Sequence, residues 1–447
     1  MLCNIYYIMS SKNYVLSNEK KRILLGHTYD GKEVFKFATS LHENNTTTFA
    51  NPITCKTSGQ VRVDMNIRTE TYNLNELLFE FDHVNTDATL SQTVLNPYLL
   101  FQEIKVYFND QQVVHYDNAE EIFCTVADNV KRYNKDEFLS LYQTTMVTNF
   151  SSLSGETIAP GQTKRWSLPF TTFVMPWLRD ISPSDGVGKL SLEVKFVGNY
   201  NTPSTIGRFM LSSTNTNPYT DSTIRFDNIQ VRTVFTRHRD PLLLKVPNAV
   251  IPIQRFAEKQ YLLPSWNATT DSFRVQLSQE FSHYRNCNGI YVYLYPSSNV
   301  TTYNDADCMK VNSSASLIGW ELRWKSRTII NFSTPTDLNR KVKYYHDTYQ
   351  KKHGKFLDDA MISDSTDKSK VWIPLTMIDL QSVGNGSNDD HSLVYSGIGN
   401  QNSDLELILY NTQGAFCAGT CLLNVVLGYM EFFSLDSKSG TVREIAV

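Results

Sequence analysis

Residues 100–134 read LFQEIKVYFNDQQVVHYDNAEEIFCTVADNVKRYN, and residues 316–350 read SLIGWELRWKSRTIINFSTPTDLNRKVKYYHDTYQ. Each stretch has two apolar runs with the alternation of β-strands, separated by a polar segment, and then apolar residues at helical spacing. The stretches align without a gap at an offset of 216, which places Ile104 on Trp320 and Val113 on Ile329. Such agreement over about thirty residues indicates an internal duplication, so function depends on how two copies of one β-rich unit assemble.

Each copy predicts a β-hairpin followed by an amphipathic helix. The hairpin connections are Asn109–Gln112 and Lys325–Thr328, whose polar residues suit short turns. Residues that can cap a helix stand before each predicted helix: Asp117 or Asn118 in the first copy and Thr336 or Asp337 in the second. The predicted apolar helix faces are Ile122, Val126, Val130 and Tyr133 in the first copy, and Leu338, Val342, Tyr345 and Tyr349 in the second.

The duplication extends on both sides of this stretch. Before it, Phe273–Val275 matches Val61–Val63 at an offset of 212, and Tyr291–Tyr293 matches Phe79–Phe81. After the helix, each copy returns to a strand through a tryptophan and a proline, and the proline favours a sheet edge because it lacks a backbone donor. The remaining segments of this part of the repeat are 166–170 and 372–375, 190–196 and 405–411, and the closing strands 224–235 and 422–433.

Composition sets limits on the class of protein. A chain of 447 residues is long enough for two domains with their own cores. Aromatic residues make up 12% of the chain, and together with many β-branched residues they favour strands over helices. A net charge of -3 argues against general nucleic-acid binding, which needs clustered Lys and Arg.

Seven cysteines indicate reduced thiols and no disulfide framework, because their number is odd and their spacing irregular: 3, 55, 124, 287, 308, 417 and 421. The N-terminus lacks the basic region and cleavage site of a signal peptide. The apolar stretch 415–433 is long enough for a membrane span, but Asn424 and Glu431 interrupt it. Two buried strands with a turn at Gly419–Thr420 explain that stretch better.

No motif predicts catalysis. Gly186–Lys189 resembles part of a phosphate-binding loop, but the first glycine and the final Ser or Thr are missing, so a turn before a strand is expected. His346 and His353 lie two helical turns apart among lysines, which favours a solvated basic face over a metal site. Cys417 and Cys421 are expected to be small core residues. We therefore predict no catalytic, cofactor-binding or metal-binding residue and no cofactor.

The order of these elements resembles one viral protein family. Its features in this sequence are a polar turn ending in Gln, a second strand, a tyrosine-containing helix, an aromatic strand with proline, a Met-Pro pair and a Leu-Glu-Val-Lys-Phe strand: Gln111, Val113, Tyr133, Trp166, Pro169, Phe170, Met175–Pro176 and Leu192–Phe196. The pattern is similar to the first jelly roll of double jelly-roll major capsid proteins. These belong to eukaryotic DNA viruses, including virophages, Polinton-like viruses and nucleocytoplasmic large DNA viruses.

The resemblance implies an all-β fold of two tandem jelly rolls, each an eight-stranded β-sandwich with a short helix after its β-hairpin. The domains expected from it are an N-terminal arm at 1–57, a first jelly roll at 58–236, a linker at 237–257, a second jelly roll at 258–433 and a C-terminal tail at 434–447.

The resemblance also implies a structural protein and not an enzyme. Three copies would form a pseudo-hexagonal capsomer of an icosahedral virion shell, assembled inside the infected host cell. The implied partners are two further copies in a homotrimer, neighbouring capsomers, penton and minor capsid proteins and a possible inner membrane, with no specific nucleic-acid sequence. The main alternative is a non-viral tandem β-sandwich that binds carbohydrate through loop aromatics such as Tyr200, Tyr219 or Tyr303; a hydrolase on the same scaffold is another.

Overall fold

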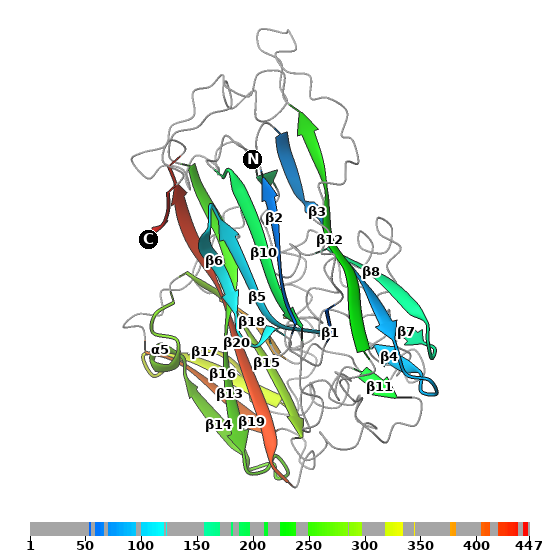
Figure 1. Cartoon of the computed structure of the whole chain (residues 1–447). Helices are drawn as coiled ribbons and strands as arrows, with labels where there is room; N and C mark the ends of the chain where they lie inside the picture. Colours follow the sequence, from blue (N-terminus) through cyan, green and yellow to red (C-terminus); the bar gives the residue numbers. More distant parts are fainter. Residues whose placement is uncertain are drawn as a thin grey trace.

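Two sets of eight main strands, one from each half of the chain, form the framework of the described structure, with five further strands attached (Figure 1). The structure is a computed structural model. It describes residues 53–54, 59–66, 70–94, 100–119, 122, 156–169, 180–181, 187–196, 210–212, 224–237, 249–284, 286–296, 318–333, 344, 376–380, 404–411, 419–436 and 441–445.

The longest strands are β3 and β12 in the first half and β13 and β20 in the second. The first half contains β1 (Ile53–Thr54), β2 (Gln60–Asn66), β3 (Glu70–Asn85), β4 (Gln92–Val94), β5 (Phe101–Phe108), β6 (Gln111–Tyr116), β7 (Glu156–Ile158), β8 (Thr163–Pro169), β9 (Asp180–Ile181), β10 (Lys189–Phe196), β11 (Met210–Ser212) and β12 (Ile224–Arg237). The second half contains β13 (Ala249–Leu263), β14 (Ser272–Gln276), the short helix α5 (Leu277–Glu280), β15 (Cys287–Pro296), β16 (Ile318–Trp324), β17 (Arg327–Phe332), β18 (Thr376–Asp379), β19 (Leu405–Asn411), β20 (Cys421–Leu435) and β21 (Val442–Ile445).

Both halves have the same strand order. In the first half the two main sheets are β1-β12-β3-β8 and β2-β10-β5-β6, and in the second they are β13-β20-β15-β18 and β14-β19-β16-β17. If the eight main strands of each half are counted along the chain, both halves give sheets in the order 1-8-3-6 and 2-7-4-5. This is the jelly-roll order, in which consecutive strands cross between two antiparallel sheets except at the hairpin of strands 4 and 5. The predicted fold class is therefore confirmed.

The two copies of the hairpin have the same backbone angles at their turns. Asn109 and Asp110 have φ of 49° and 64°, and Lys325 and Ser326 have φ of 48° and 62°. Two consecutive left-handed residues form the two-residue turn that fits the twist of a β-hairpin. The connections are thus shorter than the predicted four residues, because Gln111 and Arg327 already begin the second strands.

A β-bulge also occurs at equivalent places in the two hairpins. In the first, the register steps from Val106–Val114 to Tyr107–Gln112, and Val113 is the extra residue. In the second, it steps from Leu322–Ile330 to Arg323–Thr328, and Ile329 is extra. The offset of 216 that aligned Val113 with Ile329 in the sequence therefore aligns the two bulges as well.

The helices predicted after the hairpins are described at only a few residues. In the first copy, Ala119 and Ile122 are helical and buried, and Ile122 donates its backbone N–H to the Asn118 carbonyl (3.1 Å), which agrees with a start at Asp117 or Asn118. In the second copy, Tyr344 is helical and packs on the rings of Trp320 and Phe332. Tyr344 was not among the residues predicted for the apolar face of the second helix. The residues that were predicted for that face lie outside the described residues, and so do Val126, Val130 and Tyr133 of the first helix.

Aromatic rings fill the space between the sheets of the first jelly roll. Five phenylalanines from both sheets contact one another with ring centroids 4.2 to 6.1 Å apart: Phe79, Phe81, Phe101, Phe196 and Phe226. All five are buried. Their mixture of edge-to-face and stacked contacts adds to the free energy of burial and fixes the spacing of the sheets.

The first tryptophan-proline strand lies at a sheet edge, as predicted. β8 carries Trp166, ends at Pro169 and pairs only with β3 among the described strands. β18 is the edge strand of the corresponding sheet, although Trp372 and Pro374 themselves lie outside the described residues.

The segment Gly186–Lys189 was expected to be a turn before a strand. Gly186 is not described, and Val187 and Gly188 lead directly into β10, which agrees with that expectation.

The segments predicted as arm, linker and tail each contain residues in strands. β13 begins at Ala249, inside the predicted linker 237–257, and pairs with β20 along its whole length. Pro252 suggested a linker but lies in this edge strand, where a missing donor is tolerated. β1 lies in the predicted arm 1–57, and β21 adds a strand to β20 from within the predicted tail 434–447. Each segment is held by backbone pairing that its side-chain pattern did not reveal.

The predicted turn at Gly419–Thr420 precedes one long strand, β20. This strand accounts for most of the apolar stretch 415–433, and residues 415–418 lie outside the described residues. None of the helices in the described part of the chain is long and apolar enough to cross a membrane.

A buried histidine ties a small third sheet to the first jelly roll. The sheet, β11-β4-β7, is built from three loops. His83 of β3 is fully buried, and its Nε2 lies 2.8 Å from Oε1 of Gln92 in β4. Asn85 donates to the carbonyls of Leu90 (2.9 Å) and Ile158 (3.0 Å). Burial lowers the pKa of His83 from 6.5 to about 4, although the bond to Gln92 acts in the opposite direction.

We expect His83 to make the protein less stable in acid. The unfolded chain binds a proton at this histidine below about pH 6.5, whereas the folded chain does so only near pH 4. The free energy of unfolding should therefore fall by up to about 3 kcal/mol through this residue as pH drops across that window. Chemical unfolding of His83→Gln between pH 7 and 4 should show a shallower loss than the native chain. His283→Gln, at an exposed histidine, is the control, and equal slopes for native and His83→Gln proteins would contradict the expectation.

Candidate functional site

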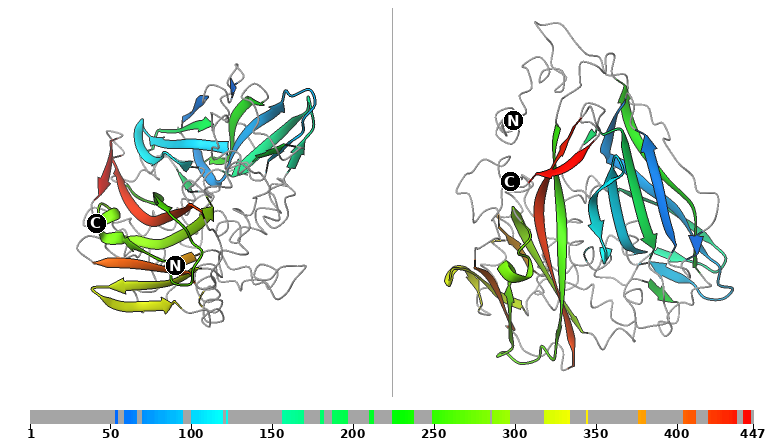
Figure 2. Two further views of the ribbon diagram at one scale, coloured as in Figure 1. Left: turned by 90° about the horizontal axis from the view of Figure 1, so that it is seen from below. Right: turned by 60° about the vertical axis from the view of Figure 1, so that its left-hand side comes forward.

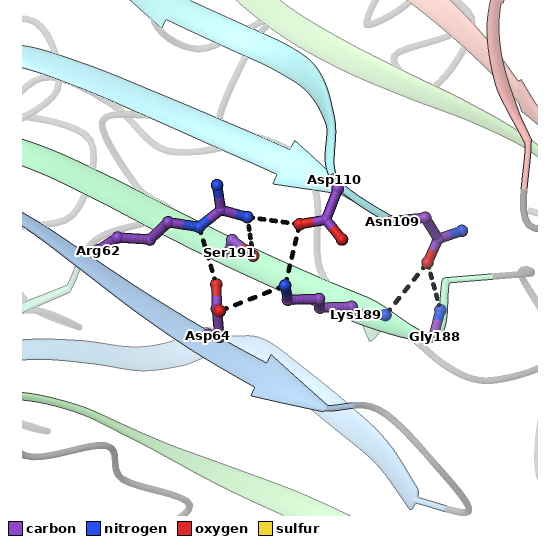
Figure 3. A network of polar contacts seen from close by, with 7 residues as sticks. All are labelled: Arg62, Asp64, Asn109, Asp110, Gly188, Lys189 and Ser191. Atoms are coloured by element: carbon purple, nitrogen blue, oxygen red, sulfur yellow. Dashed lines mark hydrogen bonds and ion pairs between the residues drawn. The ribbon is translucent and has the colours of Figure 1, made fainter.

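The hairpin turn of the first jelly roll closes a polar corner on three strands (Figure 3). Asn109 Oδ1 accepts hydrogen bonds from the backbone N–H groups of Gly188 (2.8 Å) and Lys189 (3.1 Å). The backbone N–H of Asn109 in turn donates to the Lys189 carbonyl (2.9 Å). The turn is thereby locked to the segment that enters β10.

Four charged side chains complete this corner (Figure 3). Lys189 Nζ lies 2.9 Å from Asp110 Oδ1 and 3.2 Å from Asp64 Oδ2. Arg62 bridges the same two carboxylates, with its Nε 3.0 Å from Asp64 Oδ1. Two cations and two anions thus balance each other, and Arg62 also donates to the Ser191 hydroxyl (3.2 Å).

The corner has no group free for acid–base chemistry or phosphate binding. The hydrogen bond from Lys189 lowers the pKa of Asp110. Partial burial acts to raise the pKa of Asp64, but hydrogen bonds from Ser191, Arg62 and Lys189 outweigh it and lower that pKa. Both carboxylates are held ionised, and the N–H groups of Gly188 and Lys189 that a phosphate would need are already bonded to Asn109. The resemblance of Gly186–Lys189 to a phosphate-binding loop therefore has no structural basis.

The equivalent turn of the second jelly roll has the same backbone but different chemistry. Lys325 donates its backbone N–H to the Asp404 carbonyl (3.2 Å), as Asn109 does to Lys189. The ammonium of Lys325 lies over the exposed ring of Trp324, 5.6 Å from its centre. At this tip Lys325 lies over an aromatic ring, whereas at the first corner Asp110 pairs with Lys189, so the two copies present different side chains on one scaffold.

Edge strand β6 forms a seam with the second jelly roll. The ring of Tyr116 lies 6.3 Å from that of Phe256 in β13, and the Phe256 backbone makes a hydrogen bond with the Tyr116 hydroxyl. At the other end of β6, Gln111 Oε1 accepts from the backbone N–H of Val442 in β21 (3.0 Å). Figure 2 shows β13 and β20 standing between the first jelly roll and the outer sheet of the second. The apolar side chains of both jelly rolls form one continuous cluster.

A partly buried ion pair and a buried amide pair lie in this part of β13, β15 and β20. Arg255 pairs with Glu431 and lies over the ring of Tyr429, 5.7 Å from its centre. Burial raises the pKa of Glu431, while the charge of Arg255 opposes that effect. Nearby, Gln254 and Asn288 bond through both of their amide groups, one bond being 3.0 Å from Gln254 Nε2 to Asn288 Oδ1.

A glycine makes room for the amide pair. A Cβ at Gly428 would lie 2.8 Å from Asn288 Oδ1 and 3.0 Å from Gln254 Nε2. Both amides are buried, so neither side chain can turn away without losing its partner. Glycine is therefore needed at position 428 because the two amide side chains approach its backbone closely, and not because the chain turns there.

A second polar cluster lies at the opposite end of the β5–β6 hairpin. His115 Nε2 is 2.9 Å from Glu103 Oε1 and 2.7 Å from Asp117 Oδ1. Lys105 Nζ is 2.5 Å from the same oxygen of Glu103. Partial burial acts to raise the pKa of Glu103, but hydrogen bonds from Lys105 and His115 outweigh it and lower that pKa. Within the described residues, Glu103, His115 and Asp117 are the group whose atoms converge as metal ligands do.

No local sequence pattern marks this cluster. The only indication in the sequence is that Glu103 and His115 stand on the two strands of the predicted hairpin. Counting outward from a two-residue turn, with one residue added for the bulge, brings Glu103 opposite Asp117. The sequence predicted a four-residue connection and no bulge, so it did not give the strand register that brings these side chains together.

The described cysteines, Cys287 and Cys421, are buried free thiols, as expected for core residues. Burial raises the pKa of Cys287 to about 12, which keeps it protonated and unreactive. Several residues weighed in the sequence analysis lie outside the described residues: His346, His353, Cys417, Tyr200, Tyr219 and Tyr303.

Comparison with known proteins finds similarity in structure and not in sequence. The sequence matches no protein-family model and no curated protein. The structure matches a chain of the PBCV-1 virus capsid with a TM-score of 0.59 and 11% identity, over 94% of this chain and 99% of that chain. It matches PBCV-1 VP54, fitted into a reconstruction of the virophage Sputnik, with a TM-score of 0.57 and 12% identity, over the same shares. The chain therefore has the double jelly-roll fold of these viral capsid proteins.

The amide pair predicts a strong effect of a single methyl group at the seam. Gly428→Ala should break the Gln254–Asn288 pair and leave buried amides unsatisfied, at a cost of roughly 2–4 kcal/mol in the free energy of unfolding. Gly289→Ala is the matched control, because Gly289 pairs with Gly428 across the strands and its added Cβ would meet nothing closer than 3.4 Å. Chemical denaturation should find the control within about 1 kcal/mol of the native chain. Equal stability of the two variants would show that the amide pair is unimportant.

Proposed function

We propose that this protein is a major capsid protein that builds the icosahedral shell of a DNA virus. The observation that carries the proposal is the match of both jelly rolls, in order, to a chain of a virus capsid, with 94% of this chain and 99% of that chain covered. The match thus includes both jelly rolls and nearly the whole of each chain. Fold alone does not fix function, so the proposal also depends on the surface chemistry.

The surface chemistry is that of a structural protein. At the first hairpin corner, the carboxylates of Asp64 and Asp110 are paired with Arg62 and Lys189. The polar groups of the seam are also paired: buried Gln254 with Asn288, and partly buried Arg255 with Glu431. Such groups set the shape of the molecule and have no free capacity to transform a substrate. We therefore infer that the protein acts by assembly and not as an enzyme.

The proposed assembly unit is a homotrimer. Two similar sandwiches in one chain, repeated about a three-fold axis, give six similar sandwiches in a ring, a shape that packs with six neighbours. The proposed partners are accordingly two further copies, the neighbouring capsomers, and penton and minor capsid proteins, with an inner membrane where the virus has one. The protein would be located in the virion capsid and assemble inside the infected host cell, without recognising a nucleic-acid sequence.

The mass of the assembled unit tests this proposal. Three chains of 51.1 kDa give about 153 kDa, and mass photometry at submicromolar concentration should find that species with little monomer. A trimer stable at such dilution needs large interfaces, of the size found in obligate oligomers. Electron micrographs of concentrated samples should show hexagonal plates or shells. A folded monomer that persists at micromolar concentration would overturn the proposal and favour a carbohydrate-binding sandwich.

A further inference from the structure

The cluster at the far end of the β5–β6 hairpin has an unusual charge arrangement. Lys105 pairs with His115 across the strands, and the register extended by one step brings Glu103 opposite Asp117. Like charges directly opposite each other destabilise a sheet unless a cation lies between them. His115 stands in that place, with one nitrogen within 2.9 Å of Glu103 and 2.7 Å of Asp117. A single N–H at that nitrogen cannot satisfy both carboxylates fully.

We propose that Glu103, His115 and Asp117 bind a divalent transition-metal ion of the Zn²⁺ class. An imidazole nitrogen and two carboxylate oxygens are all ligands that Zn²⁺ accepts in proteins, and a water molecule would complete its four-coordination. The three ligand atoms lie within 4.8 Å of one another. Zinc–ligand bonds near 2.0–2.1 Å require ligand separations of about 3.3 Å, so the two histidine contacts need to widen by only about half an ångström. An imidazole ligand favours Zn²⁺ over Mg²⁺ and Ca²⁺, which prefer oxygen alone.

Lys105 is the competitor for this site. Its ammonium lies 2.5 Å from Glu103 Oε1 and 3.5 Å from Glu193 Oε1. The metal ion and the ammonium repel each other, so binding requires Lys105 to move from Glu103 to Glu193. The geometry therefore predicts that removal of the lysine charge improves binding, an effect that a misfolded variant would not produce.

The fold does not require this cluster. In the second jelly roll, the offset of 216 places Gly319, Asn331 and Ser333 at the positions of Glu103, His115 and Asp117. There, Asn331 Oδ1 accepts from the backbone N–H of Ser333 (2.8 Å), a local turn with no charge. The ligand set is thus a property of the first copy, and His115 and Asp117 flank Tyr116, the residue that packs on the second jelly roll. A bound ion would fix the strand end that holds the seam together.

Zinc titration of the full-length chain in competition with a chromophoric chelator tests the proposal. The native chain should bind one Zn²⁺ that His115→Gln and Asp117→Asn lose or bind at least tenfold more weakly. Lys105→Gln should bind that ion several-fold more tightly than the native chain. His283→Gln, at an exposed histidine of the second jelly roll, should match the native chain and account for unspecific surface binding. Mg²⁺ and Ca²⁺ should not displace the zinc.

Thermal unfolding gives an independent readout. Added Zn²⁺ should raise the melting temperature of the native and Lys105→Gln chains, and EDTA should reverse the shift. Melting in EDTA alone reports whether each variant is folded. Equal zinc stoichiometry and affinity in the native and His115→Gln chains would overturn the proposal, and so would weaker binding by a folded Lys105→Gln chain. Neither result depends on whether the chain forms trimers, so the capsid proposal is tested separately.

Discussion

Burial of β20 on both faces is the constraint on which the rest of the structure depends. Alternate side chains of a strand point to opposite sides, yet Leu423, Val425 and Leu427 are buried and so are Asn424, Val426 and Met430. One face of such a strand packs inside its own sandwich, and the other requires a second apolar body. The first jelly roll reaches this side of the sheet at Tyr116 of β6, which packs on Phe256 of β13, next to β20, and one apolar cluster continues through both jelly rolls. The two sandwiches are therefore parts of one core.

This constraint explains the polar groups at the seam. A strand buried on both faces gives its neighbours no water, so each polar side chain there needs a protein partner. Gln254 and Asn288 satisfy each other, Arg255 neutralises Glu431, and Gly428 leaves the space that the amide pair occupies. These contacts contribute less to stability than the apolar burial does, but they restrict how β13 and β20 can pair.

The sequence predicts the repeated elements well because local patterns specify them. The strands of the hairpin, the central strands β10 and β19 and the edge position of β8 follow from alternation and from proline chemistry. β13 was missed because Pro252 resembles a linker residue, and only its pairing with β20 identifies it as a strand. The Glu103–His115–Asp117 cluster depends on a bulge at Val113, and the seam depends on contacts between residues more than a hundred positions apart. Neither leaves a local pattern.

The duplicated hairpin shows what the two copies retain and what they do not. Lys325 and Ser326 hold left-handed backbone angles without glycine, a conformation that costs about 1–2 kcal/mol per residue. The same turn and bulge recur in both copies because the turn matches the twist of the strands and keeps the two sandwiches alike in shape. The side chains are free to differ, and they do: Asp110 is ion-paired at the first turn, whereas Lys325 lies over the ring of Trp324 at the second. In the proposed capsomer, six sandwiches of similar backbone would form a near-regular ring, while their different surfaces would distinguish alternate positions. Similar shape and different chemistry are both needed, because identical surfaces would allow each sandwich to dock in either place.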